Sequence, residues 1–585
     1  MVVEKLIVEH IDTWTTALQT RSTAGRGSSG KIDLYGIKKL RELILELAVR
    51  GKLVSQDPND EPASVLLRGM KKQQEDLIKE KKIKKPKKLP PIDEILESIS
   101  IPQGWELCYL NDIGDWGAGA TPNRTNSGYY GGNIPWFKSG ELSEDYITDS
   151  EEHITALALK ECSLRDNQPG DVLIAMYGAT IGKTSILNTR STSNQAVCAC
   201  TPFGGLSNQY LLTFLKASKR VFTSMGAGGA QPNISKEKIV ATQFALPPLK
   251  EQLRIVEKVE QLMSLCDQLE QHSLTSLDAH QQLVETLLTT LTDSPNADEL
   301  AENWARISEH FDTLFTTVAS IDALKQTILQ LAVMGKLVPQ DPNDEPVSEL
   351  LKRIAQEKVQ LVKDGKIKKQ KPLPPISDEE KPFELPDGWE WCLFEDVVDI
   401  QSGITKGRNL ANRKLISIPY LRVANVQRGY LDLSEVKEID IPEEEKDKYH
   451  VIKGDLLITE GGDWDTVGRT TVWCHDWYIA NQNHVFKGRI IGQDIDPYWL
   501  ETHMNSPYSR DYFASASKQT TNLASINKTQ LRGCPVAIPP SNEAEKIMLK
   551  LNDFNELCEK LKLQIQSAQQ TQLHLADALT DAAIN

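Results

Sequence analysis

The hydrophobic and polar positions of this chain follow the same order twice. Apolar residues three and four apart predict an amphipathic helix around Leu40 to Leu47, and again around Leu324 to Leu331. A glycine and a short extended piece follow each helix, and then comes a DPNDEP turn whose last proline can occupy the first position of a second helix. That lysine-rich helix ends at a proline-rich break, since proline removes a backbone donor. The pattern therefore predicts one scaffold built twice.

The repeat is also nearly complete in sequence. Residues 47–62 read LAVRGKLVSQDPNDEP and residues 331–346 read LAVMGKLVPQDPNDEP, a separation of 331 − 47 = 284 positions. The agreement reaches GWE at 104–106 and 388–390, and it returns near LPP and IPP at a separation of 538 − 246 = 292. We call the segments 47–106 and 331–390 the repeated frames. A repeat of this length fixes the architecture before any single element does.

Two segments of unlike sequence follow the frames, and we call 101–248 the first domain and 385–540 the second domain. Short β-rich runs such as DVLIA (171–175) and DLLIT (455–459) alternate there with Gly, Asn and Ser turns, which predicts compact mixed α/β domains dominated by loops. Loops on a rigid scaffold often carry recognition. Near-identical frames with different inserts therefore suggest one scaffold that presents two different recognition surfaces.

A long helix is predicted after each Pro-Pro pair. Apolar residues alternate steps of four and three from Ile255 to Leu269 and from Ile547 to Ile565, the spacing of a coiled-coil seam. We expect an antiparallel pair within the chain; the alternative is that each helix packs alone on its own domain. About forty helical residues span roughly 60 Å, enough to hold two domains apart. An extra stretch at 20–31 of the first copy predicts a loop between helices.

Length and composition narrow the class of protein. A chain of 585 residues is too long for one core, and 40% hydrophobic with 25% charged residues is ordinary for globular domains. Charges interrupt every long apolar run, so we expect no membrane span, no signal peptide and a cytoplasmic location. Nine cysteines without a CxxC pair indicate reduced, mostly buried thiols rather than a zinc site or a disulfide framework.

The formal net charge of −15 argues at first against a nucleic-acid partner. Phosphate binding depends on local patches, however, and the charge is uneven. Lys71 to Lys88 holds nine lysines against three acids, and Lys352 to Lys371 repeats the pattern. Each lysine alone is most simply part of a solvated helix face. Their recurrence in both copies leaves a role toward a DNA backbone or a partner protein open.

Motifs for covalent chemistry are absent from the sequence. GATIGKT at 178–184 resembles a phosphate-binding loop, but three residues separate its glycines where four are required, so we interpret it as an ordinary loop. There is no GxSxG, HExxH or paired-cysteine motif, and no Pro-Pro-aromatic motif typical of amino-methyltransferases. We therefore expect a chain that is not an enzyme and has no cofactor or metal of its own.

Several short motifs occur in a fixed order along both copies. They are PxGWE at Pro102 and Pro386, GATP…GNIPW, PGDVLIA with KGDLLIT, NQA (194–196) with NQN (481–483), QPNIS, and LPPLKEQLRIV. The second copy departs from the pattern at QSGIT (401–405) and at Pro-Tyr (419–420). In this order, the motifs resemble those of the specificity subunit of type I restriction–modification enzymes, and the resemblance covers essentially the whole chain.

The resemblance implies an α+β fold with a pseudo-twofold internal repeat. Two mixed α/β target-recognition domains would be joined by a pair of long antiparallel coiled-coil helices. We expect an N-terminal helical region at 1–100, target-recognition domain 1 at 101–248, a central region with a spacer helix at 249–384, target-recognition domain 2 at 385–540, and a C-terminal spacer helix at 541–585.

The same resemblance implies a subunit that binds double-stranded DNA. Each domain would read one half of a bipartite asymmetric target, and partners would perform the adenine methylation or restriction. The implied partners are two modification subunits, which hold S-adenosylmethionine, and restriction subunits, which use ATP and Mg. Two domains held apart can contact one face of a duplex about one turn, ~34 Å, apart.

Candidate DNA contacts follow from residue chemistry. Lys, Arg and polar groups bind phosphates, and Arg, Lys, Asn and Gln also reach base edges. Any one of them can instead cap a loop or be a solvated charge, so we expect only a minority to touch bases. The first-domain candidates are Asn123, Arg124, Lys138, Lys183, Asn194, Gln195 and Gln231. The second-domain candidates are Lys406, Arg408, Arg413, Arg422, Asn425, Arg428, Arg469 and Lys518.

Two other classes of function stay open on the sequence. An interaction scaffold built on the coiled coil, without DNA specificity, would show no salt-sensitive DNA affinity. A self-sufficient methyltransferase or nuclease would need the cofactor and catalytic motifs that the sequence lacks.

Overall fold

The chain forms two compact units, each with one α/β domain and one repeated frame. The computed structural model describes residues 2–21, 31–90, 92, 101–226, 232–411, 413–462, 466–520 and 523–584. The first unit holds Met1–Thr23, Gly30–Thr275 and Gln569–Asn585, and the second holds Ser276–Ala568. The predicted repeat of a mixed α/β domain is thereby confirmed.

The first domain is built on two sheets and a short pair of strands. Its larger sheet has the order β4(Gly114–Ala118), β11(Val197–Pro202), β8(Val172–Ala175), β9(Thr184–Leu187), β6(Tyr146–Ile147). The smaller sheet has the order β10(Thr192–Ser193), β5(Tyr130–Phe137), β7(His153–Ile154), and β3(Glu106–Tyr109) pairs with β12(Gln243–Leu246). Apolar residues from both sheets, among them Phe137, Leu173 and Val197, form one buried cluster between them.

The second domain repeats the central part of this topology with other residues. Its larger sheet has the order β14(Val398–Ser402), β21(Val485–Ile490), β17(Leu456–Thr459), β19(Thr470–Val472). The smaller sheet has the order β16(Lys437–Pro442), β15(Leu415–Leu421), β20(Ala480–Asn481), and β13(Glu390–Leu393) pairs with β24(Pro535–Ile538). A third sheet, β18(Gly461–Gly462), β23(Leu523–Ser525), β22(Lys518–Thr520), completes the domain.

Strand register corrects one predicted correspondence between the domains. Ser193 pairs with Phe137 on β5, and Asn481 pairs with Leu421 on β15. Asn194 therefore corresponds to Gln482, not to Asn481. The predicted match of NQA with NQN is wrong by one residue. Strand pairing determines which loop residues correspond, whereas identical residue types alone do not.

Short helices complete the two domains. In the first domain they are α5(Ala156–Glu161), α6(Asn208–Ala217), α7(Lys219–Gly226) and α8(Lys236–Val240). In the second domain they are α14(Phe394–Val397), α15(Lys446–Tyr449), α16(Pro497–Met504), α17(Pro507–Ala516) and α18(Lys528–Arg532). Side chains of Ser207 and Asp496 cap the backbone N–H groups at the starts of α6 and α16.

Each repeated frame and the helix that leads into it form a matching helix pair. These are α3(Tyr35–Val49) with α4(Ala63–Lys79), and α12(Val318–Val333) with α13(Val347–Lys363). Pro62 and Pro346 are the residues before α4 and α13 rather than their first residues, one position from the prediction. In both copies the first helical N–H donates at 2.9 Å to the glycine carbonyl of PxGWE. This bond ties each frame to the start of its domain.

The N-terminal segment and its counterpart also match. The helices α1(Val2–Glu9) and α2(Ile11–Thr16) correspond to α10(Ala297–Glu309) and α11(Phe311–Leu314). The stretch 20–31 was predicted to be a loop, but its ends belong to β1(Gln19–Arg21) and β2(Lys31–Asp33), which pair antiparallel. Residues 22–30 lie outside the described residues.

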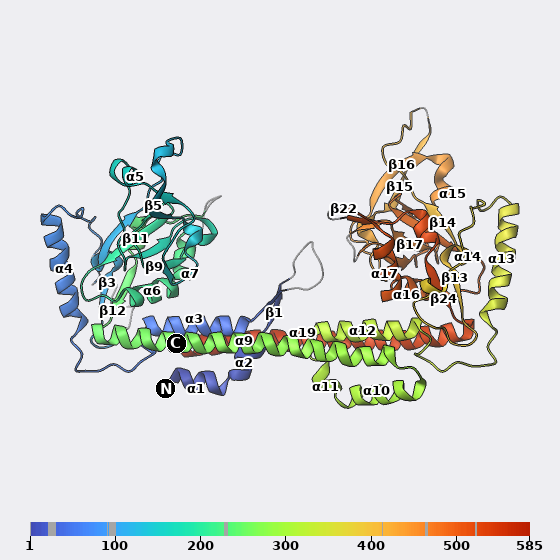
Figure 1. The fold of residues 1–585 in the computed structure, drawn as a ribbon, viewed down its shortest axis with the longest axis horizontal. Coiled ribbons are helices and arrows are strands. Elements are labelled where there is room, and N and C mark those ends of the chain that lie inside the picture. The colour runs from blue at the N-terminus through green and yellow to red at the C-terminus, as the bar shows by residue number, and fades with distance from the viewer. Residues whose placement is uncertain are drawn as a thin grey trace. The chain divides into compact units, whose positions relative to one another are not determined.

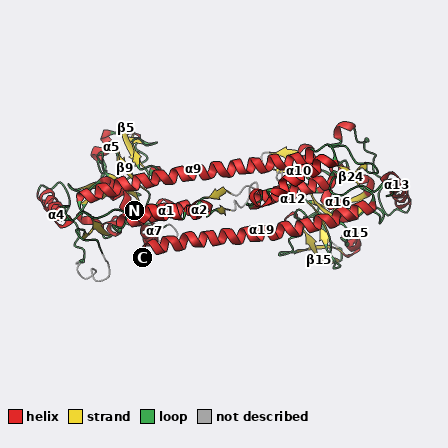
Figure 2. Ribbon diagram, turned by 90° about the horizontal axis from the view of Figure 1, so that it is seen from below, coloured by secondary structure: helices red, strands yellow, loops and turns green. Residues whose placement is uncertain are grey.

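The two predicted long helices are α9(Leu249–Asp293) and α19(Ser541–Ile584). α9 begins in the first unit and ends in the second, whereas α19 does the reverse, so the helices run antiparallel as predicted. Each unit adds a third helix to the pair. Figure 2 shows α12 between α9 and α19 in the second unit, where Lys325 of α12 pairs with Glu559 of α19 at 3.1 Å. Within the described residues, no helix is long and apolar enough to cross a membrane.

In the first unit α3 makes the corresponding contacts to both long helices. Arg41 pairs with Asp267 of α9 at 2.7 Å and with Glu270 at 2.8 Å. Lys39 pairs with Asp577 of α19 at 2.8 Å. The helices α3 and α12 therefore take part in holding the long helices in register.

Candidate nucleic-acid interface

A buried carboxylate near the start of each long helix ties that helix to its frame. Glu251 and Glu543 are each 1% exposed. Gln56 donates to Glu251 at 3.0 Å, and Gln340 donates to Glu543 at 3.2 Å. Trp389 of PxGWE donates its indole N–H to Glu543 at 3.0 Å. Burial raises the pKa of both glutamates. The glutamine–glutamate bond recurs in both units, whereas the loops of the two domains differ.

Two loops meet on the first domain, one after β4 and one after β10. Gly119 has no room for a side chain, because a Cβ would collide with the carbonyl oxygen of Asn194. Thr121 donates a hydrogen bond to Gln195 across the same junction. The close approach brings the candidates of both loops to one surface. Figure 1 shows β5 and α5 on the side of this domain away from α3 and α9.

Arg124 and Lys138 form the basic centre of that surface. The guanidinium carbon of Arg124 lies 5.0 Å from the ring centre of Trp136 and 4.8 Å from that of Tyr130. Glu152 accepts a hydrogen bond from Arg124 at 2.6 Å and pairs with Lys138 at 2.5 Å. These cations hold the pKa of Glu152 below its usual range. Stacked, half-exposed cations of this kind can meet phosphates or base edges.

The remaining first-domain candidates divide into loop caps and neighbours. Asn123 accepts hydrogen bonds from the backbone and hydroxyl of Thr125, and Asn194 accepts one from the N–H of Ala196 at 3.0 Å. These side chains shape their own loops. Lys183 lies on a separate loop, between β8 and β9. Gln231 lies outside the described residues.

The second domain builds the same surface from different residues. Gly403 lies against the carbonyl oxygen of Gln482, as Gly119 does against its counterpart. The ammonium of Lys406 lies 5.2 Å from the ring centre of Tyr420, and Tyr420 holds the place of Trp136 in the strand pairing. A cation over an aromatic ring on the central strand is therefore common to both domains.

Arg408 and Arg413 extend this surface along the loop after β14. The guanidinium of Arg408 lies 5.8 Å from the ring centre of Tyr449 and pairs with Glu445 at 2.7 Å. Arg413 pairs with Glu445 at 3.2 Å and with Glu444 at 2.6 Å. The hydrogen bond from Arg408 lowers the pKa of Glu445.

Asn425 is a turn cap rather than an accessible contact. It is 3% exposed, accepts the backbone N–H of Arg422 at 2.9 Å, and donates to two backbone carbonyls. Glu141 caps the corresponding turn of the first domain by accepting the N–H of Lys138 at 2.6 Å. Burial argues against a direct DNA contact for Asn425, whereas Arg422, paired with Glu435 at 2.9 Å, lies at the surface.

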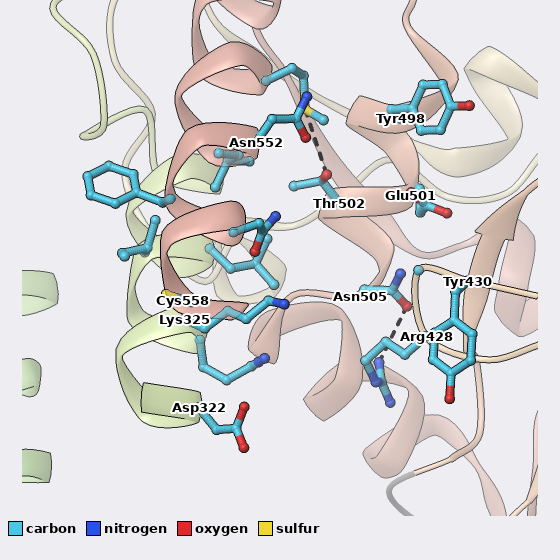
Figure 3. A pocket seen from close by; sticks show the side chains of 18 of the residues that line it. Asp322, Lys325, Arg428, Tyr430, Tyr498, Glu501, Thr502, Asn505, Asn552 and Cys558 are labelled. Atoms are coloured by element: carbon cyan, nitrogen blue, oxygen red, sulfur yellow. Dashed lines mark hydrogen bonds between the residues drawn. The ribbon is translucent and has the colours of Figure 1, made fainter. Parts of the chain in front are cut away.

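Arg428 and Arg469 belong to another part of the second domain. Arg469 donates to Gln427 at 2.8 Å, and Arg428 donates to Asn505 at 3.5 Å. Arg428 lines a polar cavity of about 680 Å³, which α12, α16 and α19 also line. Figure 3 shows Arg428 beside Tyr430 and Asn505 in this cavity. Lys518 lies on β22, but its side chain is outside the described residues.

Sequence reasoning found cations and missed the groups that hold them. Trp136, Tyr420 and Tyr449 are buried, and each lies beneath a charged side chain, which residue type alone does not indicate. Glu152 and Glu445 are acids, which a search for phosphate-binding residues passes over. The repeated Pro-aromatic pair before Lys138 and Arg422 was the available signal.

The described residues hold no group of three or more His, Cys, Asp and Glu side chains placed to bind a metal ion. The GATIGKT segment continues into strand β9, whereas a phosphate-binding loop of that type leads into a helix. The prediction of an ordinary loop is thereby confirmed.

Burial raises the pKa of the Cys198 thiol to about 12, so this cysteine is protonated at neutral pH.

Comparison with known families agrees with the duplicated architecture. The model of the type I restriction modification DNA specificity domain matches residues 102–279 and 386–568, one match in each α/β domain and together more than half of the chain. The chain belongs to the type I restriction–modification specificity subunits. Its family membership confirms the resemblance on which the predicted fold rested.

Two relatives match this specificity subunit over the full length of both chains. The type I restriction enzyme EcoEI specificity subunit of Escherichia coli is 45% identical over 610 aligned residues, and the EcoAI specificity subunit of the same species is 46% identical over 611. Among solved structures, one on complex assembly of the type I R-M system covers 83% of this chain and 99% of its own at 16% identity and a TM-score of 0.45. The HsdS subunit from Thermoanaerobacter tengcongensis covers 83% and 98% at 15% identity and a TM-score of 0.38.

Proposed function

We propose that this specificity subunit binds double-stranded DNA and that each domain reads one half of a bipartite, asymmetric target. It is the non-catalytic subunit, and it directs adenine methylation or restriction by its partners. One observation carries the proposal. The two domains share the order of their central strands and a cation over an aromatic ring at the same strand position, yet their loops carry different sets of charges: Lys406 and Arg413 of the second domain stand where the first has Pro122 and Tyr129.

Different loops on a shared topology suit two different half-sites. Phosphate contacts fix the register of a protein on a duplex, while base-edge contacts carry the sequence. In the first domain Arg124 and Lys138 are the best placed of the candidates, and in the second Lys406, Arg408, Arg413 and Arg422 are. The formal net charge of −15 does not oppose this role, because these cations gather on one surface of each domain.

The chemistry would lie on partner subunits. Two modification subunits would hold S-adenosylmethionine and the adenine-methylating site, and restriction subunits would use ATP and Mg. Two near-identical frames suit two copies of the same partner. Such an assembly would act in the cytoplasm, where the cell's DNA is accessible.

The test is methylation mapping. This chain and its cognate modification subunit would be co-expressed, and plasmid DNA would be read by single-molecule sequencing that detects methyladenine. We expect a split, asymmetric motif whose appearance depends on this chain. Absence of chain-dependent methylation, with a modification subunit that is active beside another specificity subunit, would contradict the proposal.

A further inference from the structure

Glutamates hold most of the candidate cations on the two surfaces. The ion pairs are Glu152 with Arg124 and Lys138, Glu445 with Arg408 and Arg413, and Glu435 with Arg422. The distances lie between 2.5 and 3.2 Å. Each carboxylate therefore lies within the group of cations that is expected to meet DNA.

Stability accounts for little of the Arg124–Glu152 pair, whereas Arg408 and Glu445, 25% and 16% exposed, are less screened by water. Exposed ion pairs contribute little to folding, because water screens them and ordering two side chains costs entropy. The Arg124 side chain is 54% exposed and that of Glu152 is 32% exposed. A cluster of cations without carboxylates would bind phosphates of any sequence. The carboxylates reduce that affinity, since like charges repel when a phosphate approaches.

The two domains obtain their carboxylates from different places. Trp136 on β5 lies opposite Glu152, whose carbonyl accepts the Trp136 N–H at 2.9 Å. The corresponding residue opposite Tyr420 is Lys437, a charge of the other sign. The second domain instead uses Glu445, which follows β16. Because the carboxylate is present in both domains although its position differs, it is not a remnant of the duplication.

We propose that Glu152 and Glu445 are specificity-determining residues, each for the half-site that its own domain reads. The inference rests on the proposed function. Each carboxylate opposes the phosphates of every duplex. A correct half-site offsets that cost, because its base edges accept the hydrogen bonds that Arg124 or Arg408 gives up when it leaves its glutamate. An incorrect half-site offers only phosphate, so its binding is weakened.

The experiment uses the full chain in complex with its co-expressed modification subunit. Fluorescence anisotropy would measure its affinity for the mapped target and for duplexes in which one half-site is scrambled, each at two salt concentrations. The variants are Glu152→Gln and Glu445→Gln. The matched controls are Glu151→Gln, which removes a neighbouring charge, and Glu443→Gln, whose carboxylate pairs with Lys414 at 2.7 Å and with none of the candidates.

We expect Glu152→Gln to bind one of the two half-scrambled duplexes about tenfold more tightly, while its affinity for the intact target changes less than about threefold. Glu445→Gln should do the same for the other half-scrambled duplex. Equal effects of Glu152→Gln and Glu151→Gln would mean a general charge effect and would overturn the inference, as would unchanged discrimination. A wild-type complex that cannot tell target from scrambled duplex would overturn the proposed function itself.

Discussion

The two units place different chemistry at one buried position. Phe214 lies seven residues after the cap of α6 (214 − 207 = 7), and His503 lies seven residues after the cap of α16 (503 − 496 = 7). Phe214 packs against Phe244 with ring centres 4.7 Å apart. His503 packs against Trp391 at 6.0 Å and also makes hydrogen bonds.

His503 is tolerated because both ring nitrogens have partners. Its Nε2 accepts the N–H of Ala537 at 3.1 Å, and its Nδ1 lies 3.2 Å from the Ser509 hydroxyl. Burial lowers its pKa to about 3, so the ring is neutral at pH 7. The comparison shows that one fold accepts an apolar ring or a fully hydrogen-bonded polar ring at the same place. The buried histidine makes the stability of the second unit sensitive to acid.

We expect the largest effect on stability from removing the ring of Phe214. Phe214→Ala removes a packed ring and leaves a cavity, so we expect the first unit to lose about 3–5 kcal/mol of stability. Hydrogen exchange in increasing urea, read separately for the two units, would measure it. The peptides of the second unit should keep their protection; an equal loss in both units would contradict the separation of their cores.

A buried acid gives the next contrast. Asp455, 2% exposed, accepts two hydrogen bonds from Arg489, at 2.8 and 2.7 Å. In the first unit Asp171, also 2% exposed, takes the place of Asp455, and Thr201 takes the place of Arg489, while Arg165 reaches in from a loop to pair with Asp115 at 2.6 Å.

Arg489→Met would leave Asp455 buried without its cation, so we expect a loss of about 2–3 kcal/mol in the second unit. Arg165→Met should cost less, about 1 kcal/mol, because Asp115 retains contact with water. Urea unfolding followed by unit-resolved hydrogen exchange would rank the two variants. The reverse order would show that the loop arginine is the more important of the two.

We expect acid to destabilise the second unit through its buried histidine. His503 has a folded pKa of about 3 against an ordinary value of 6.5, so the unfolded chain binds the proton first as the pH falls. Its contribution to stability is complete above pH 6.5 and is lost progressively toward pH 3. At pH 5 the loss is about 2 kcal/mol.

The free energy of unfolding of the second unit, measured at pH 7.5 and at pH 5, would test the predicted loss of stability in acid. His503→Gln should be less stable at pH 7.5 but should lose less between the two values. Phe214 does not titrate, so the same position in the first unit adds no pH dependence to the stability of that unit. A wild-type second unit as stable at pH 5 as at pH 7.5 would refute the assignment.

The smallest effect concerns DNA affinity. Lys406 over Tyr420 and Arg124 over Trp136 are exposed cations, so removing either with Ala should weaken binding of the target by about three- to tenfold. The salt dependence of binding should become less steep for each variant. Measurements at two salt concentrations would test this, and a variant with unchanged affinity and unchanged salt dependence would place that cation outside the interface.

The sequence by itself determined the architecture of this protein. A repeat separated by 284 positions, apolar spacing and Pro-Pro stops are local or periodic signals, and they predicted two α/β domains, two frames and two long antiparallel helices. Candidate cations such as Arg124, Lys138 and Arg408 could also be chosen by residue type, because charge and hydrogen-bonding capacity belong to the side chain itself.

Only the tertiary structure decided how those cations are held. The pairing of β5 with β7 brings Glu152 and Trp136 next to Arg124. The sequence does not show that these three residues are neighbours. It also showed that Asn425 is a buried cap, that Asn194 corresponds to Gln482, and that a third helix joins the long pair in each unit. Contacts between residues far apart in the chain depend on register and packing, which periodicity alone does not specify.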